Sequence, residues 1–253
     1  MDATAVDGNW MPYRWWQLPD PLSGRWMAYA EMLHEFSSEL ANIINDLTTN
    51  VHRLRAWDRT VSPLSIDEKL AATHEFIDIL GTVALGQPYA IKSRFAYAAA
   101  HLCHQANRAK VAGAWKDEFP QKETLYLNEI EPFCRGWKTY RSFKRRVEPI
   151  AGKRFKETSD DFRNAYNHRF SSRLVLGMTS ITSRFKNEDG AIGYAFGGKP
   201  ALALADIADL LLTERDLCYA AFEGFQALIG EQTTAISNFQ AAEQSPENSN
   251  RAR

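Results

Sequence analysis

The spacing of apolar residues between positions 23 and 61 predicts one long helix. Ser23 suits its start, because a Ser hydroxyl at the N-cap accepts a hydrogen bond from a backbone amide of the first turn. Two series of residues then recur every seven positions, and side chains at that spacing share one helix face. The series are Ala30, Ser37, Ile44 and Val51, and then Leu33, Leu40, Leu47 and Leu54. We expect this face to pack inside a helical bundle, with a coiled coil between two chains as the alternative.

Local break signals predict four further helices before residue 177. Pro63 ends the first helix, and Ser65 followed by Glu68 has the spacing of a capping box. The second helix therefore begins there, and it ends near Gly86, with Pro88 just beyond. The other three are expected over 89–112, over 123–147 and from residue 160 or 161 onward.

After residue 177 the pattern changes to two short runs of β-favouring residues. Residues 180–185 and 191–196 are separated by Lys-Asn-Glu-Asp-Gly, and the pair Asp189-Gly190 is a turn signal. Apolar residues alternate with small ones in the second run, as they do in a strand. The pattern predicts one β-hairpin, followed by a last helix over 201–233.

Together these elements predict an all-α fold, an antiparallel helical bundle that carries one small β-hairpin near 180–196. We expect a single domain over 23–240. Residues 1–22 contain three Trp and three Pro without a helical period, so they are expected to form an N-terminal arm. The polar residues 241–253 are expected to form a flexible tail.

Composition and charge narrow the class of protein. The chain has 253 residues, 45% of them hydrophobic, and a net charge of −1, which excludes a disordered chain and a polycation. No apolar run approaches the ~20 residues of a membrane span, and the N-terminus lacks the pattern of a signal peptide. Cys103, Cys134 and Cys218 form no CxxC pair, which suits reduced thiols better than a zinc site. We expect a cytoplasmic protein with no membrane partner.

Positive charge is concentrated between Arg135 and Arg173. This window holds twelve Lys or Arg residues against four acidic ones, and aromatic residues are interleaved with them. Cations beside aromatic rings suit a polyanion whose bases can stack, such as single-stranded RNA. Lys144, Arg145 and Arg146 are therefore candidate substrate-binding residues. The alternative is a basic helix face that is simply solvated, and the charge pattern alone leaves it open.

A polar cluster at 163–168 stands out inside this window. On a helix with about 100° per residue, four polar residues share one arc about 140° wide. These are Arg163, Asn164, Asn167 and His168. The side expected to face the core holds Phe162, Ala165, Tyr166 and Phe170. Because Asn is a poor helix former, two Asn and a His on an exposed arc indicate a functional site.

These side chains suit phosphodiester chemistry. His168 can exchange a proton near neutral pH, and Arg163 offers a planar fork of donors to a phosphate. Asn164, one turn before His168, can orient the imidazole or hold a phosphate oxygen. Asn167 and Arg169 are further candidates for substrate binding. Since no carboxylate cluster for Mg²⁺ accompanies them, we predict RNA cleavage by the 2′-hydroxyl with imidazole assistance, and neither metal nor cofactor.

The run Arg163-Asn164-x-x-x-His168 resembles the Arg-polar-x-x-x-His motif of the HEPN superfamily. The resemblance implies a four- or five-helix bundle that usually dimerises, with the motifs of both subunits at the interface. Many members are metal-independent endoribonucleases of toxin–antitoxin and antiphage systems. It also implies that Arg163 and His168 are catalytic, that Asn164 supports them, and that RNA, a second copy of the chain and an antitoxin or other regulatory protein are partners.

Two other functions remain alternatives. One is a catalytically silent HEPN-like module that binds RNA or a nucleotide, or holds a partner protein. The other is a helical interaction protein that uses the seven-residue repeat over 30–54. The hairpin is not part of the minimal HEPN bundle, so it is an elaboration or a sign that catalysis has been lost.

A second Arg–His pair and a His–His pair occur near residue 100. Arg94 and His101 have a looser motif spacing, but Phe95 stands where the polar residue is expected. His101 and His104 have the i, i+3 spacing of metal ligands, yet no further ligand lies nearby in sequence. We expect these histidines to have packing or capping roles.

Overall fold

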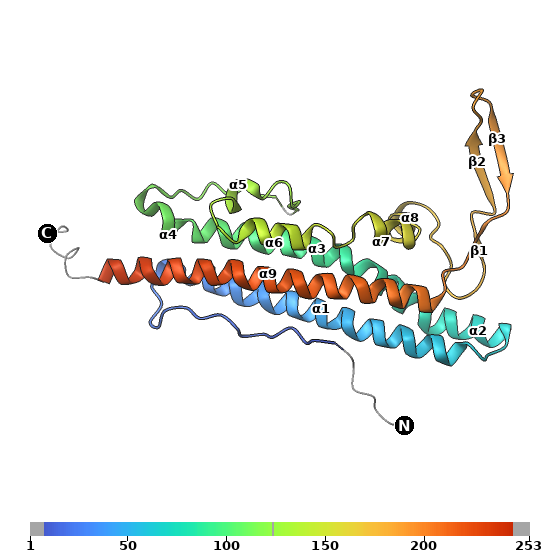
Figure 1. Ribbon diagram of the computed structural model, residues 1–253, viewed down its shortest axis with the longest axis horizontal. Helices are drawn as coiled ribbons and strands as arrows, with labels where there is room; N and C mark the ends of the chain where they lie inside the picture. The colour runs from blue at the N-terminus through green and yellow to red at the C-terminus, as the bar shows by residue number, and fades with distance from the viewer. Residues whose placement is uncertain (1–7, 123, 245–253) are drawn as a thin grey trace. The chain divides into compact units, whose positions relative to one another are not determined.

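The computed structural model describes residues 8–122 and 124–244, and it is mainly α-helical with a small antiparallel β insertion (Figure 1). The mainly α prediction is therefore confirmed. Three helices are long: α1 (Met27–Val61), α3 (Asp78–Ala106) and α9 (Leu204–Gln244). The short helices are α2 (Ile66–Ala72), α4 (Arg108–Val111), α5 (Glu131–Cys134), α6 (Tyr140–Val147), α7 (Lys153–Thr158) and α8 (Phe162–His168).

The chain folds into two compact units. Among the described residues, unit 1 comprises Gly8, 46–88 and 151–216, and unit 2 comprises 9–45, 89–150 and 217–244. The helices α1, α3 and α9 each supply residues to both units. The sequence pattern predicts one domain over 23–240, although the break signal at Gly86 and Pro88 falls at the limit between the units in α3.

The core of unit 2 is rich in aromatic residues. Phe95 packs edge-on against Phe143 and Phe225, with ring centroids 6.0 Å apart in each pair. The described part of the N-terminal arm joins this core, since Trp15 lies 6.1 Å from Phe225. The amide of Met11 also donates to the Asn45 side chain at 2.8 Å. Residues 1–7 of the predicted arm lie outside the described residues.

Leucine residues of the seven-residue repeat are buried inside the chain. Leu33, Leu40, Leu47 and Leu54 are each at most 1% exposed. Because these side chains are buried within the chain, this face belongs to its core. Burial of each Leu side chain contributes roughly 1.5–3 kcal/mol to stability. This burial agrees with the expectation that the repeat packs inside its own chain. An interaction protein that presents this repeat to a partner is contradicted, because these side chains are already covered.

The predicted helix break near Gly86 and Pro88 is wrong, because α3 continues through both residues. A proline inside a helix removes one backbone hydrogen bond and costs about 3 kcal/mol. Ala84 and Leu85 are fully buried on the preceding turn. The side chain of Asn50 also donates to Gln87 at 3.0 Å. Tertiary packing therefore outweighs the local break signal.

Other predicted helix limits also need correction. The helix expected over 123–147 is only α5 and α6, and residues 124–130 are not helical. The helix expected over 89–112 ends at Ala106, before α4. The last helix runs to Gln244 instead of 233, so residues 241–244 are not a flexible tail. Burial of Gln240, whose side chain donates to the Pro21 carbonyl at 2.7 Å, accounts for that extension. Residues 245–253 lie outside the described residues.

Two small antiparallel ladders lie between α8 and α9 in the chain. Strands β2 (Thr182–Lys186) and β3 (Ile192–Phe196) form the predicted hairpin (Figure 1). Strands β1 (Met178–Thr179) and β4 (Lys199–Pro200) pair before and after it. None of the helices in the described part of the chain is long and apolar enough to cross a membrane.

Candidate functional site

Helix α8 presents the polar arc of the sequence motif to solvent. Phe162 and Ala165 are buried, while Arg163, Asn164, Asn167 and His168 are exposed. The prediction that Tyr166 and Phe170 face the core is wrong, since they are 58% and 88% exposed. The helix ends at His168 and the backbone of Arg169 is not helical, so a helical wheel does not place Phe170.

A groove of about 950 Å³ in unit 1 borders the end of α8. His168 lines it together with three cationic side chains, those of Arg169, Arg173 and Lys199. Residues 178–182, which include β1 and the first residue of β2, also line the groove. The fold thus brings the predicted His168 and Arg169 to one surface. It does the same for two cations that the motif did not include.

The acidic residues of the groove are engaged by neighbours. Asp160 accepts hydrogen bonds from Lys199 and, at 2.8 Å, from the Ser172 hydroxyl. Burial pushes the pKa of Asp160 upward, but these two donors outweigh it and hold that pKa below the ordinary 3.8. Asp161 accepts from Asn164 at 2.8 Å and lies 3.8 Å from Arg169.

Two side chains of the groove, His168 and Arg173, differ from the acidic residues. Within residues 8–122 and 124–244, neither the His168 imidazole nor the Arg173 guanidinium has a hydrogen-bond or ion-pair partner. Both side chains are exposed. Arg173 was part of the predicted basic window, but no spacing rule singled it out. Lys199 lies in β4, and only the folded chain brings it to Asp160.

The remaining residues of the motif do not line the groove. Arg163 and His168 are five positions apart, which places them about 140° apart around α8. Asn164 donates to Asp161 and not to His168. Within one chain, therefore, the structure does not bring the Arg and the His of the motif to a common point.

The basic run on α6 lies in unit 2 and is largely ion-paired. Lys144 contacts Glu131 at 2.9 Å, and Arg146 contacts Glu223 at 2.9 Å. Exposed Arg145 has no such contact in the part of the chain that the structure describes. The hydrogen bond from Lys144 is the largest cause of the lowered pKa of Glu131. Two of these three candidate residues thus have a structural role already.

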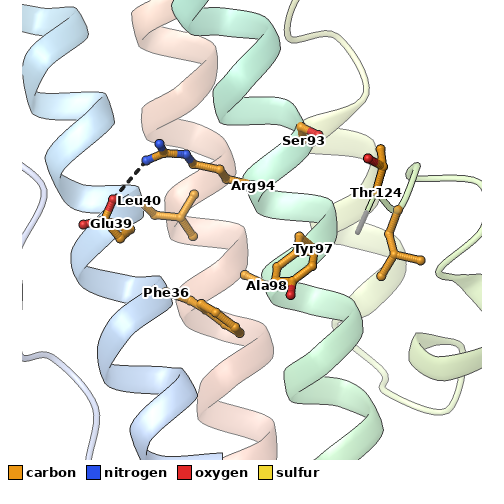
Figure 2. A pocket seen from close by; sticks show the side chains of 9 residues that line it. Phe36, Glu39, Leu40, Ser93, Arg94, Tyr97, Ala98 and Thr124 are labelled. Atoms are coloured by element: carbon orange, nitrogen blue, oxygen red, sulfur yellow. Dashed lines mark hydrogen bonds and ion pairs between the residues drawn. The ribbon is translucent and has the colours of Figure 1, made fainter. Parts of the chain in front are cut away.

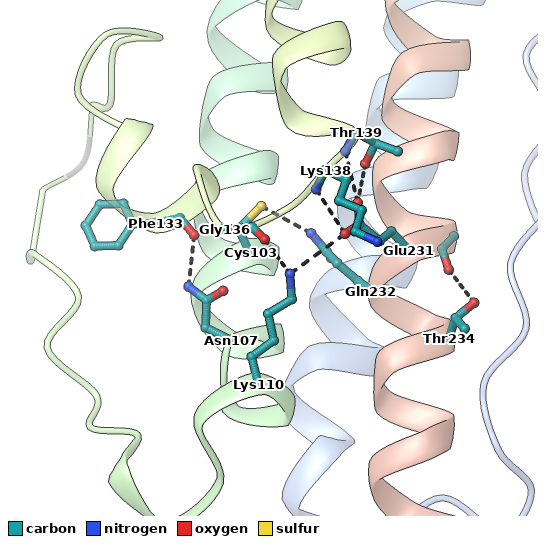
Figure 3. A network of polar contacts seen from close by, with 11 residues as sticks. Cys103, Asn107, Lys110, Phe133, Gly136, Lys138, Thr139, Glu231, Gln232 and Thr234 are labelled. Atoms are coloured by element: carbon teal, nitrogen blue, oxygen red, sulfur yellow. Dashed lines mark hydrogen bonds and ion pairs between the residues drawn. The ribbon is translucent and has the colours of Figure 1, made fainter.

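A second polar centre in unit 2 holds the start of α6 against α9 (Figure 3). The Glu231 carboxylate accepts from the amides of Lys138 and Thr139, each at 3.0 Å, and from the Thr139 hydroxyl at 2.8 Å. Lys110 lies 3.7 Å from the same carboxylate. Burial raises the pKa of Glu231, but these donors outweigh burial and lower it below the ordinary 4.5.

Arg94, of the second Arg–His pair of the sequence, lines a smaller cleft in unit 2, and His101 does not. This cleft has a volume of about 340 Å³ and is lined by residues of α1, α3 and the loop after α4. Figure 2 shows Arg94 directed at Glu39, and the two side chains form an ion pair at 3.2 Å. His101 lies against Tyr97 and Phe119 with ring centroids 4.2 Å apart in each pair. Burial lowers the pKa of His101, and His104 lowers it further.

The expected packing role of these histidines agrees with their contacts. His104 is 7% exposed, and its Nε2 lies 2.8 Å from an Asp117 carboxylate oxygen. Among the described residues, no three His, Cys, Asp or Glu side chains form a group that could hold a metal ion.

The chain was compared with protein-family models, curated proteins and solved structures. No protein-family model, no curated protein and no solved structure matches the chain. The function is therefore argued from the side chains of the groove and from their surroundings.

Proposed function

We propose that the chain is a metal-independent endoribonuclease of the HEPN type, with His168 as its proton-transfer group. The groove of unit 1 is the observation that supports this proposal. Its two carboxylates are held by neighbouring residues, whereas the His168 imidazole and the Arg173 guanidinium are accessible. An imidazole and a guanidinium that line one groove suit a phosphodiester whose negative charge grows during reaction.

The proposed reaction needs only groups of the protein and of RNA. The 2′-hydroxyl oxygen attacks the adjacent phosphorus, and neutral His168 accepts the hydroxyl proton. The bond from phosphorus to the 5′ oxygen breaks, and His168 returns the proton to that oxygen. The products are a 2′,3′-cyclic phosphate and a free 5′-hydroxyl. Arg173 stabilises the charge on the phosphate oxygens.

The proposal includes a homodimer with a composite site. Arg163 lies about 140° from His168 around the same helix and does not line the groove, so a second copy of the chain would have to supply the Arg of the motif. Asn167 and Arg169 then bind the flanking phosphates. An antitoxin or other regulatory protein, and a cytoplasmic location, are part of the same proposal and follow from the resemblance to the family.

The test is RNA cleavage by the full chain in EDTA. His168→Gln should reduce cleavage at least about a hundredfold, the usual contribution of a general base. His74 is also exposed in unit 1 but does not line the groove, so His74→Gln is the matched control. Equal loss in both variants, or equal activity in both, would contradict the assignment of His168.

A second candidate function is an RNA-binding module without cleavage. The hydrogen bond from Asn164 to Asp161, and the separation of Arg163 from His168, favour it. Such a module binds RNA in a salt-dependent manner and leaves it intact in the same assay.

A further inference from the structure

The hairpin of β2 and β3 exposes large apolar side chains on both strands. Every residue of β2 is exposed, and β3 is exposed except at one position. Tyr194 and Phe196 are 60% and 80% exposed, and Ile192 is 55% exposed. An isolated two-stranded hairpin is marginally stable in water, and a cluster of exposed apolar residues commonly marks a binding surface.

The strand register sorts these side chains onto two faces. Residues directly opposite in an antiparallel pair project to the same face, and successive residues alternate between faces. Arg184 is opposite Tyr194, Lys186 is opposite Ile192, and Thr182 is opposite Phe196. All six share one face, which we call the stacking face.

The opposite face is different in chemistry. It holds the pairs Ser183–Ala195 and Phe185–Gly193. The Phe185 ring lies across Gly193, where a β-carbon would be 2.7 Å from the ring. This face therefore contains one aromatic ring, placed over a glycine, and no cation.

We propose that the stacking face binds the bases and phosphates of single-stranded RNA and leads the strand into the groove at His168. Tyr194 and Phe196 offer rings for base stacking, and Arg184 and Lys186 offer cations for the phosphates. This inference rests on the proposed function, and it identifies the part of the substrate that lies outside the groove.

Continuity with the groove supports this assignment. Ile181 and Thr182, at the base of β2, line the same groove as His168. A strand that follows β2 toward its start therefore arrives at the proposed reaction centre. The acidic residues Glu188 and Asp189 form the exposed tip of the hairpin, which disfavours insertion of the tip into an anionic membrane.

The test measures RNA binding by the full chain that carries His168→Gln, so that cleavage does not remove the ligand. The probe is a short, fluorescently labelled, mixed-sequence single-stranded RNA, followed by anisotropy. Tyr194→Leu and Phe196→Leu should each raise Kd at least about fivefold, which corresponds to the loss of one stacked base. Leu keeps an apolar side chain, so a protein or lipid partner would tolerate the change.

Phe185→Leu is the matched control, because it makes the same change on the opposite face. Phe185→Leu should alter the Kd for RNA by less than about twofold. Arg184→Gln, on the stacking face, should weaken RNA binding and reduce the dependence of binding on salt. Equal Kd values for the variants of both faces, or an absence of RNA binding, would overturn the proposal. If the wild type cuts RNA but the stacking face has no effect on Kd, this inference fails and the proposed function stands. If binding depends on the stacking face without any cleavage, only the nuclease proposal fails.

Discussion

Asp160 and Asp161 determine how the groove is built at the level of single residues. Both have left-handed backbones, with φ of 54° and 49°, a conformation that Asp tolerates better than most residues. They turn the chain between α7 and α8. Asp160 then joins Ser172 and Lys199, which are far apart in sequence. The acids thus have a structural role, and His168 and Arg173 remain accessible.

Sequence reasoning predicted the exposure of His168 but not the importance of Arg173. Helical periodicity over 162–168 places His168 on the solvent side without knowledge of the fold. Arg173 lies beyond the helix, where no periodic pattern applies. Its position depends on the turn at 160–161 and on the backbone contact of Arg173 with Leu202 at 2.8 Å.

Glu231 gives a prediction about pH. The pKa of Glu231 in the folded protein lies below the ordinary 4.5. The ionised carboxylate therefore stabilises the fold fully above pH 4.5, and this stabilisation is lost as the pH falls through the pKa of the folded protein. Glu231→Gln should lower the free energy of unfolding by about 1 to 2 kcal/mol at pH 7, and by less below pH 4.5. Urea unfolding at both pH values measures this difference.

The control is Glu223→Gln on the same helix, whose carboxylate is 70% exposed in its ion pair with Arg146. Exposed pairs contribute little, so this variant should lose less than about 1 kcal/mol. A pH-independent loss for Glu231→Gln would contradict the account of the network.

At the level of elements, sequence signals predicted a helix cap and a hairpin turn, because neighbouring residues form both. Ser65 and Glu68 form the predicted capping box, and the hairpin turns near the predicted Asp189-Gly190. The break at Pro88 failed because burial of the neighbouring residues outweighs it. The helix expected over 123–147 failed because Pro132 marks the start of a new short helix, α5. Farther along, Glu231 accepts from the Thr139 amide just before α6.

Helix α2 should depend on its cap. It has no buried residue, so packing contributes little to its stability. Ser65→Ala should cost about 1 kcal/mol and increase amide hydrogen exchange within α2. Ser62→Ala, an exposed serine just before the cap, should leave exchange unchanged. Hydrogen exchange read by mass spectrometry distinguishes the two, and equal protection in all three proteins would show that the cap is not needed.

At the level of the whole molecule, the division into two units could not be predicted from the sequence. Domain boundaries are usually recognised by flexible linkers, but here α1, α3 and α9 each supply residues to both units. The break signal at Gly86 and Pro88 falls at the limit between the units, yet it does not interrupt α3. The charge pattern of the sequence also failed to predict that the basic window is divided between the two units. The basic window 135–173 is continuous in sequence, whereas Lys144 belongs to unit 2 and Arg173 to unit 1.

The proposed composite site predicts complementation between inactive variants. Arg163→Gln and His168→Gln should each be inactive alone. In an equal mixture that exchanges subunits, half of the dimers contain one copy of each variant. Such a mixed dimer has one intact site and one that lacks both residues. About a quarter of the wild-type cleavage rate should therefore return. The rate of RNA cleavage before and after mixing measures this. Failure to recover activity, with dimers shown by light scattering, would contradict a site shared between copies.

The central claim is tested most directly by identifying the RNA ends that the wild type leaves in EDTA. Attack by the 2′-hydroxyl predicts 2′,3′-cyclic phosphate and 5′-hydroxyl ends, and no cleavage of the same oligonucleotide with 2′-O-methyl groups. His168→Gln should leave the unmodified RNA intact under the same conditions. Cleavage of the 2′-O-methyl RNA, 5′-phosphate products, or activity only after a divalent metal is restored would contradict the proposed mechanism.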